Sequence, residues 1–127
     1  MEKWLKITHT NELYYVELPD SHGNTFLDAA HRELECGWIE FVYCRFQNLT
    51  LCLLIDECGK LKDGWTNRIN NVATLLYAPG IDCIIGNALL GKIVGEDVVP
   101  LSADEYRRFI QFITSVLSDV KFMEASK

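Results

Sequence analysis

The sequence lacks the excess of basic residues that a general nucleic-acid-binding protein needs. It has 12 lysines and arginines against 18 aspartates and glutamates, which gives a formal net charge of −6 and a pI near 5.0. Because binding to a phosphate backbone requires a basic surface, this balance argues against general nucleic-acid binding. It leaves room for one basic pocket, so a small anionic ligand stays compatible with the composition.

The chain also lacks long apolar runs and paired cysteine motifs. No segment has the roughly 20 consecutive apolar residues of a membrane-spanning helix, and residues 1–6 lack the apolar core of a signal peptide. The five cysteines form no CxxC pair and indicate no zinc site. We expect a cytoplasmic protein with no membrane association, reduced core thiols and neither metal nor cofactor. The cysteines are Cys36, Cys44, Cys52, Cys58 and Cys83.

A chain of 127 residues with 49% hydrophobic content is typical of one globular domain with a single core. Residues rich in β-branched and aromatic side chains predict strands, and apolar residues at helical spacing predict helices. The resulting order, ββαββαβα, predicts an α+β fold in which about three helices pack on an antiparallel or mixed sheet. The predicted strands are 4–8, 13–18, 38–46, 49–55 and 83–94.

The third and fourth predicted strands form a hairpin around the two-residue loop Gln47-Asn48. Both faces of this hairpin are apolar, so we expect it at the centre of a sheet that is covered on both sides. The same register places Cys44 and Cys52 on opposite faces, which argues against a disulfide between them. The expected cross-strand pairs are Phe41–Leu54, Val42–Leu53, Tyr43–Cys52 and Cys44–Leu51.

Local signals predict the ends of the first helix. Thr25, with Asp28 three residues later, is typical of an N-cap, and Phe26, Ala30 and Leu34 then recur at helical spacing. Glycine is the common left-handed residue after a helix, so Gly37 is expected to end this one.

Similar signals delimit the other two helices. Thr66 or Asn67 is expected to cap the second, which Ala-Pro-Gly at 78–80 ends, and residues 102–105 form a capping box for the third. Residues 123–127 are expected to fray. The apolar face of the third helix is expected to comprise Phe109, Ile113, Val116, Leu117 and Val120.

The stretch from Gly86 to Lys92 matches the GxxxxGK pattern of a phosphate-binding loop but lacks the parts that do the binding. Ile93 stands where a serine or threonine would hold magnesium, and residues 93–95 favour a strand or turn over a helix. We therefore interpret this stretch as a strand interrupted by glycine.

No complete set of catalytic residues is recognisable. Cys58 lies in a polar segment near Lys60 and Lys62, which favours a reactive thiol, but no histidine is close to it in sequence. Asp56 and Glu57 are adjacent, so on a strand they point to opposite faces and share no proton. We interpret these carboxylates as a solvated strand end and Cys58 as a turn residue. A non-enzymatic protein is expected, with a hydrolase or thiol enzyme as a lesser alternative.

The segment that follows the fourth predicted strand contains four residues that suggest a ligand site. Trp65 is suited to stack on a base, Asn67 to hydrogen-bond a ring edge or ribose, and Lys60 and Arg68 to neutralise phosphate. The start of the next helix would add free amides. In the alternative interpretation, Trp65 covers the core and Arg68 pairs with a carboxylate such as Asp63.

Several short motifs in residues 25–95 carry a family resemblance: Cys36-Gly37-Trp38-Ile39-Glu40, Asp56-Glu57-Cys58-Gly59-Lys60-Leu61, Asn67, Ala73-Thr74, Asp82 and Ile85-Gly86. In these the chain resembles domain-of-unknown-function family 3846 of phage and mobile-element proteins. It departs from the family at Cys36, where a Gly-Gly pair is expected, and at Cys58, where an acidic residue often precedes the glycine. The resemblance implies an accessory protein from a phage, plasmid or conjugative element, but no reaction and no catalytic residues.

Two functions follow as hypotheses. The first is a protein that sequesters a small nucleotide-like ligand through Lys60, Trp65, Asn67 and Arg68, as a homo-oligomer and in a counter-defence role. The second is an interaction module that inhibits or regulates a host or element-encoded protein. The second draws on the acidic surface and on an aromatic stripe of the last helix wide enough to leave apolar area free. That stripe comprises Tyr106, Phe109, Phe112 and Ile113.

Overall fold

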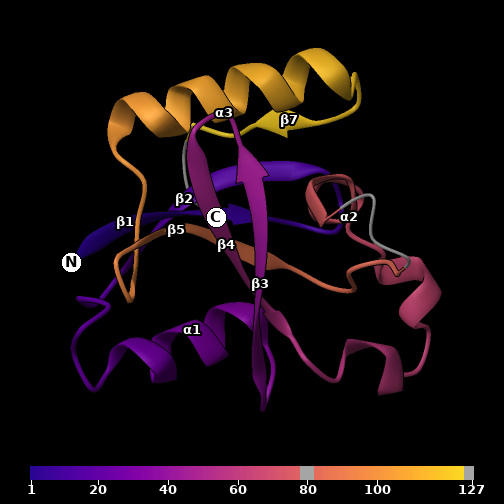
Figure 1. The fold of residues 1–127 in the computed structure, drawn as a ribbon. Coiled ribbons are helices and arrows are strands. Elements are labelled where there is room, and N and C mark those ends of the chain that lie inside the picture. Colours follow the sequence, from indigo (N-terminus) through magenta and orange to yellow (C-terminus); the bar gives the residue numbers. More distant parts are fainter. Residues whose placement is uncertain (78–81, 125–127) are drawn as a thin grey trace.

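The structure, a computed structural model, describes residues 1–77 and 82–124 and confirms an α+β fold with a mixed sheet. Within these residues seven strands form one sheet, accompanied by three α-helices and two 3-10 helices (Figure 1). The helices are α1 (Phe26–Leu34), η1 (Gly59–Leu61), η2 (Trp65–Arg68), α2 (Asn71–Tyr77) and α3 (Ala103–Val116). The strands are β1 (Glu2–Ile7), β2 (Glu12–Leu18), β3 (Ile39–Phe46), β4 (Leu49–Asp56), β5 (Ala88–Val94), β6 (Asp97–Val99) and β7 (Lys121–Phe122).

The strands follow the order β3-β4-β5-β1-β2-β7, and β6 pairs with β5 outside this path. The β2–β7 pair is parallel and the other pairs are antiparallel. Figure 1 shows α1 on one side of the sheet and α3 on the other. None of the helices in the described residues is both long and apolar enough to cross a membrane.

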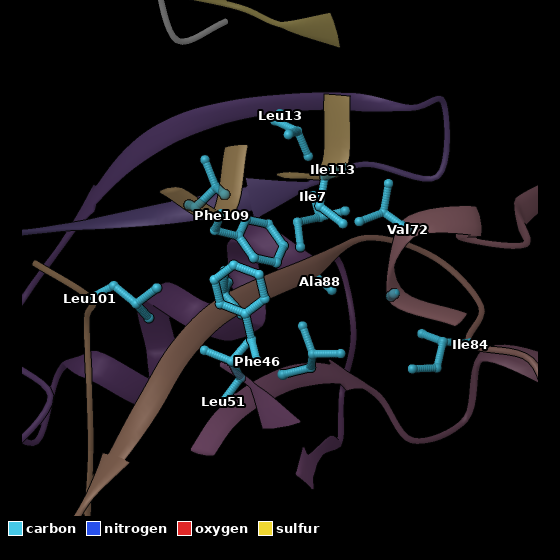
Figure 2. Packing of buried hydrophobic residues seen from close by; sticks show 14 of the residues in the cluster. Ile7, Leu13, Phe46, Leu51, Val72, Ile84, Ala88, Leu101, Phe109 and Ile113 are labelled. Atoms are coloured by element: carbon cyan, nitrogen blue, oxygen red, sulfur yellow. The ribbon is translucent and has the colours of Figure 1, made fainter. Parts of the chain in front are cut away.

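The sheet separates two hydrophobic clusters. The first lies between the sheet and helices α2 and α3, where the rings of Phe46 and Phe109 meet edge to face at 5.6 Å (Figure 2). The second lies under α1, where the rings of Trp4 and Phe26 are 5.1 Å apart. Because strand side chains alternate between faces, apolar residues at successive positions of β4 supply both clusters.

The predicted register of the β3–β4 hairpin is confirmed at every expected pair, including Val42 with Leu53 and Tyr43 with Cys52. Cys44 packs against the first cluster and Cys52 lies in the second, so the two thiols occupy opposite faces as predicted. The expected central position is wrong, because β3 ends the strand order. Tyr43 is accordingly 57% exposed.

The first helix begins after Thr25 as predicted, but the Thr25 side chain makes no capping hydrogen bond. Its end differs from the prediction, because Glu35 and not Gly37 takes the left-handed conformation, with φ of 54°. The N–H of Cys36 donates to the carbonyl of His31, which closes the last turn before Gly37 is reached.

The predicted N-cap is confirmed for α3 but not for α2. In α3, Ser102 and Glu105 form the predicted capping box, although the helix ends at Val116 and Val120 is buried beyond it. In α2, the cap is Asn70 and not Thr66 or Asn67, because residues 65–68 form η2. The predicted stop at 78–80 lies outside the described residues.

Two strand ends also differ from the prediction. β5 begins at Ala88, because residues 83–87 form an irregular segment in which Ile85 makes a single bridge to Ile69. At the C-terminal end, the N–H of Met123 donates to the carbonyl of Leu13 at 2.7 Å, so Met123 is held where fraying was expected to begin. Residues 125–127 lie outside the description.

The GxxxxGK stretch enters a strand from Ala88 onward, as predicted, but Gly91 does not interrupt that strand, because it pairs regularly with Cys52. Gly91 lies inside β5, and the Lys92 ammonium binds the Glu105 carboxylate at 2.7 Å. A Cβ at Gly91 would lie 2.5 Å from the Trp4 ring and 2.8 Å from the Val99 carbonyl oxygen. Gly91 is therefore required for the close packing of Trp4.

We predict that Gly91→Ala lowers the free energy of unfolding by about 1–3 kcal/mol, because the added methyl group overlaps a buried ring and a backbone oxygen. Gly37→Ala is the matched control, since a Cβ there has no neighbour within 4 Å. Urea denaturation of both variants measures the difference. Equal stability of the two would contradict this account of the β5 packing.

Candidate functional site

The four residues of the predicted ligand site lie between β4 and α2, on η1 and η2 (Figure 1). Lys60 and Trp65 lie together, with the Lys60 ammonium 5.9 Å from the centre of the Trp65 ring. Lys60 also pairs with Asp82, and this hydrogen bond raises the pKa of Lys60 and lowers the pKa of Asp82. The Lys60 charge is thus directed at a carboxylate of the chain itself.

The other two predicted residues point elsewhere. Asn67 is exposed, and its side chain makes no hydrogen bond within the described residues. A Cβ on Gly86 would lie 3.5 Å from Nη2 of Arg68, so the guanidinium rests against that glycine. Arg68 forms no ion pair with Asp63 in the described part of the chain, although that pair was the alternative expectation. Lys60 lines a pocket to which the other three residues do not contribute.

The start of α2 is used by the protein itself. Asn70 is fully buried, and its Oδ1 accepts the N–H of Ala73 at 3.0 Å. Its amide nitrogen donates to the carbonyls of Ile7 and Gly86, each at 2.9 Å. One of the amides expected to be free at this helix end, that of Ala73, is therefore bound by an internal cap, because Asn70 is held in the core.

The Asp56 carboxylate was expected in solvent, yet the residue is only 7% exposed. Its Oδ1 accepts the N–H of Cys58 at 2.9 Å, and its Oδ2 lies 2.8 Å from the Lys62 ammonium. A buried carboxylate needs such partners, and here they fix the turn after β4. Cys58 is a turn residue, as interpreted from the sequence. The described residues contain no group of three or more His, Cys, Asp or Glu suited to a metal ion.

His9 is a polar residue near Arg68 that was not singled out in the sequence. Its backbone N–H donates to Oδ1 of Asn87 at 3.1 Å, while its ring Nδ1 is buried without a hydrogen-bond partner. Burial lowers the pKa of His9, the positive charge of Arg68 lowers it further, and Glu35 acts in the opposite direction. No sequence motif surrounds His9, so its proximity to Arg68 is seen only in the structure.

A groove outside the predicted site lies between α2, α3 and the β3–β4 turn, with a volume of about 440 Å³. Phe112 is 44% exposed and Val116 50% exposed, and both belong to α3. The Phe112 ring lies 5.4 Å from the Phe46 ring at the groove floor. The lining residues are Arg45, Phe46, Gln47, Leu75, Leu76, Phe112 and Val116.

The structure divides the predicted aromatic stripe of the last helix. Tyr106, Phe109 and Ile113 are buried in the first cluster, whereas Phe112 faces the groove. The sequence signal for the groove side is the spacing of four between Phe112 and Val116, which places them on one face of α3. The contribution of α2 to the groove has no such signal.

Comparisons with protein-family models, with curated proteins and with solved structures found no match. The resemblance to domain-of-unknown-function family 3846 stays a prediction. The geometry of the groove and of the segment around Arg68 is therefore the basis for a functional proposal.

We predict that Asn70→Ala lowers the free energy of unfolding by about 3 kcal/mol, because three buried hydrogen bonds are lost together. Asn67→Ala is the control, since that side chain is exposed and makes no hydrogen bond in the described residues. Thermal and urea unfolding measure both variants. A loss as small as that of Asn67→Ala would contradict the role given to Asn70.

We predict opposite pH effects from two histidines. The pKa of His9 is lowered below 6.5 in the fold, so the unfolded state binds more protons and stability falls as the pH drops through 6.5. The pKa of His22 is raised by its hydrogen bond to Asp20 and then by Asp97, so its contribution is present below 6.5 and is lost as the pH rises.

Unfolding measured from about pH 7.5 to about pH 5 tests this difference. His9→Gln should remove part of the acid destabilisation, and His22→Gln should increase it slightly, since His22 is solvent-exposed. Parallel pH profiles for the two variants would refute the assignment.

Proposed function

We propose that this chain is a protein-binding module whose groove between α2 and α3 receives an apolar helix that carries an acidic residue. The observation on which the proposal rests is the pair of exposed side chains, Phe112 and Val116, beside a hollow of about 440 Å³. Exposed apolar side chains gathered around one concave surface are typical of binding sites.

Apolar contacts would supply most of the binding free energy. Leu75 of α2 is 40% exposed and faces the same groove as Phe112 and Val116. An amphipathic helix inserts side chains spaced three or four residues apart into such a groove, between two helices and over an apolar floor. Phe46 and Leu76 provide that floor.

The charge at the rim specifies the acidic residue of the partner. Arg45 lines the groove, is exposed, and has no ion pair or hydrogen bond from its side chain within the described residues. On the α3 side, Arg108 binds Asp104 and the side chain of Gln47, so its charge is already engaged. A carboxylate on the partner would pair with Arg45 and orient the helix.

This proposal takes up the second of the two functions expected from the sequence. Sequestration of a nucleotide-like ligand by Lys60, Trp65, Asn67 and Arg68 has less support. Asp82 binds Lys60, and the Arg68 guanidinium lies against Gly86. Phe112 and Val116, by contrast, are exposed at one groove and need no rearrangement to meet a partner.

We predict the outcome of selecting helix-forming peptides from a displayed library against the purified protein. Enriched peptides should carry apolar residues at i and i+4 and an acidic residue beside them. Leu75→Gln and Val116→Gln should each weaken binding about tenfold, because each removes an apolar contact worth about 1.4 kcal/mol. Isothermal titration calorimetry with one selected peptide measures the change.

Matched controls separate the groove from the rest of the surface. Leu61→Gln changes an exposed leucine of η1 outside the groove and should leave affinity unchanged. Arg45→Glu should reverse the selection toward basic peptides, whereas Arg32→Glu on α1 should not. Selected peptides that bind the Leu75→Gln variant as tightly as the wild type would contradict the proposal, as would a selection that enriches no apolar helix.

A further inference from the structure

Three chain segments bring His9 and Arg68 to the adjacent residues Asn87 and Gly86. The antiparallel β1–β5 register ends at the pair Ile7–Ala88, and His9 lies in the turn that follows β1. The backbone N–H of His9 donates to Oδ1 of Asn87. The N–H of Gly86 donates to the carbonyl of Arg68 at 2.7 Å.

Two side-chain nitrogens of this cluster have no hydrogen-bond partner among the described residues. They are Nε of Arg68 and Nδ1 of His9, and both atoms are buried. Nη2 of Arg68 lies 3.5 Å from the position that a Cβ on Gly86 would occupy, so a bare backbone faces the guanidinium. Buried polar nitrogens are nearly always hydrogen-bonded in folded proteins, so two unpaired nitrogens close to Gly86 and Asn87 are the feature that needs an explanation.

We propose that Arg68 and His9 together bind the oxyanion group, phosphate or carboxylate, of a small ligand beside Gly86. Arg68 would donate from Nε and Nη2 as a planar fork, which matches the oxygen spacing of both groups. His9 would donate from Nδ1. Because Gly86 has no side chain, the space beside the Arg68 guanidinium is left free for the ligand. Gly86 also has a left-handed φ of 84°, which any other residue would adopt only with strain.

The charges around the cluster favour a bound anion. Arg68 and burial together lower the pKa of His9, and an anion between the two would offset the repulsion. Glu35 also acts on His9, but this residue is exposed and its charge is screened by water. Anion binding should therefore strengthen as the pH falls and His9 takes up a proton.

This site is independent of the proposed protein-binding groove, since none of the groove residues belongs to it. The proposed anion site shares Arg68 with the ligand site predicted from the sequence. It contains His9 but not Lys60, Trp65 or Asn67. Loss of function at the groove would leave the anion site intact, so each proposal fails or succeeds separately.

The test is an NMR titration of the full chain with inorganic phosphate and, separately, with sodium acetate. The Nε–H signal of Arg68 and the ring signals of His9 should shift together and saturate. Phosphate binding alone identifies a phosphorylated ligand, acetate binding alone identifies a carboxylate ligand, and binding of both supports the shared chemistry. Arg68→Gln should weaken binding at least about tenfold, which corresponds to about 1.4 kcal/mol.

Three further variants make the assignment specific. Arg68→Lys should also weaken binding, because lysine lacks the fork, and His9→Gln should abolish the strengthening at low pH. Lys60→Gln removes a nearby charge that Asp82 already engages and should leave affinity unchanged. Absence of saturable shifts with both anions, or equal weakening by Lys60→Gln and Arg68→Gln, would overturn the proposal.

Discussion

The buried side chain of Asn70 is the contact on which both proposed surfaces depend. Its amide donates to the carbonyls of Ile7 and Gly86, and its oxygen caps the first turn of α2. One side chain thus joins the end of β1, the segment before β5 and a short helix. Because α2 begins at this junction, the same amide sets where Leu75 stands beside α3 and where Arg68 lies beside Gly86.

Unpaired arginines stand out against the acidic composition of the chain. With 18 acidic and 12 basic residues, carboxylates are abundant enough to pair with every cation. Arg32, Arg45 and Arg68 nevertheless form no ion pair within the described residues, while Lys60, Lys62 and Lys92 each do. An arginine left unpaired among excess carboxylates is available to an anionic partner. Arg45 lies at the groove rim and Arg68 beside Gly86, so each belongs to one of the two proposed surfaces.

Features that depend on neighbouring residues were predictable from the sequence. The β3–β4 register follows from a two-residue turn, and the capping box of α3 from Ser102 and Glu105. The position of β3 at the sheet edge was not predictable, because apolar residues on both faces suit a central strand equally well. The spacing of four residues between Phe112 and Val116 predicts that both lie on one face of α3, which forms one side of the groove. The contribution of α2 depends on how the helices pack and has no signal in the sequence.

The sequence by itself determined the five longer strands, the hairpin register and the α+β class, because these follow from side-chain periodicity and turn length over short stretches. It did not reveal the short strands β6 and β7, which have too few residues to show a periodicity. Only the tertiary structure decided which polar side chains would be buried. Three residues look alike in sequence, as polar residues beside a loop: Asn70, Asp56 and Arg68. In the structure Asn70 caps α2, Asp56 binds the turn after β4, and Nε of Arg68 has no partner in the described residues. The difference arises from groups distant in the chain, such as the carbonyl of Ile7, which no local pattern places next to them.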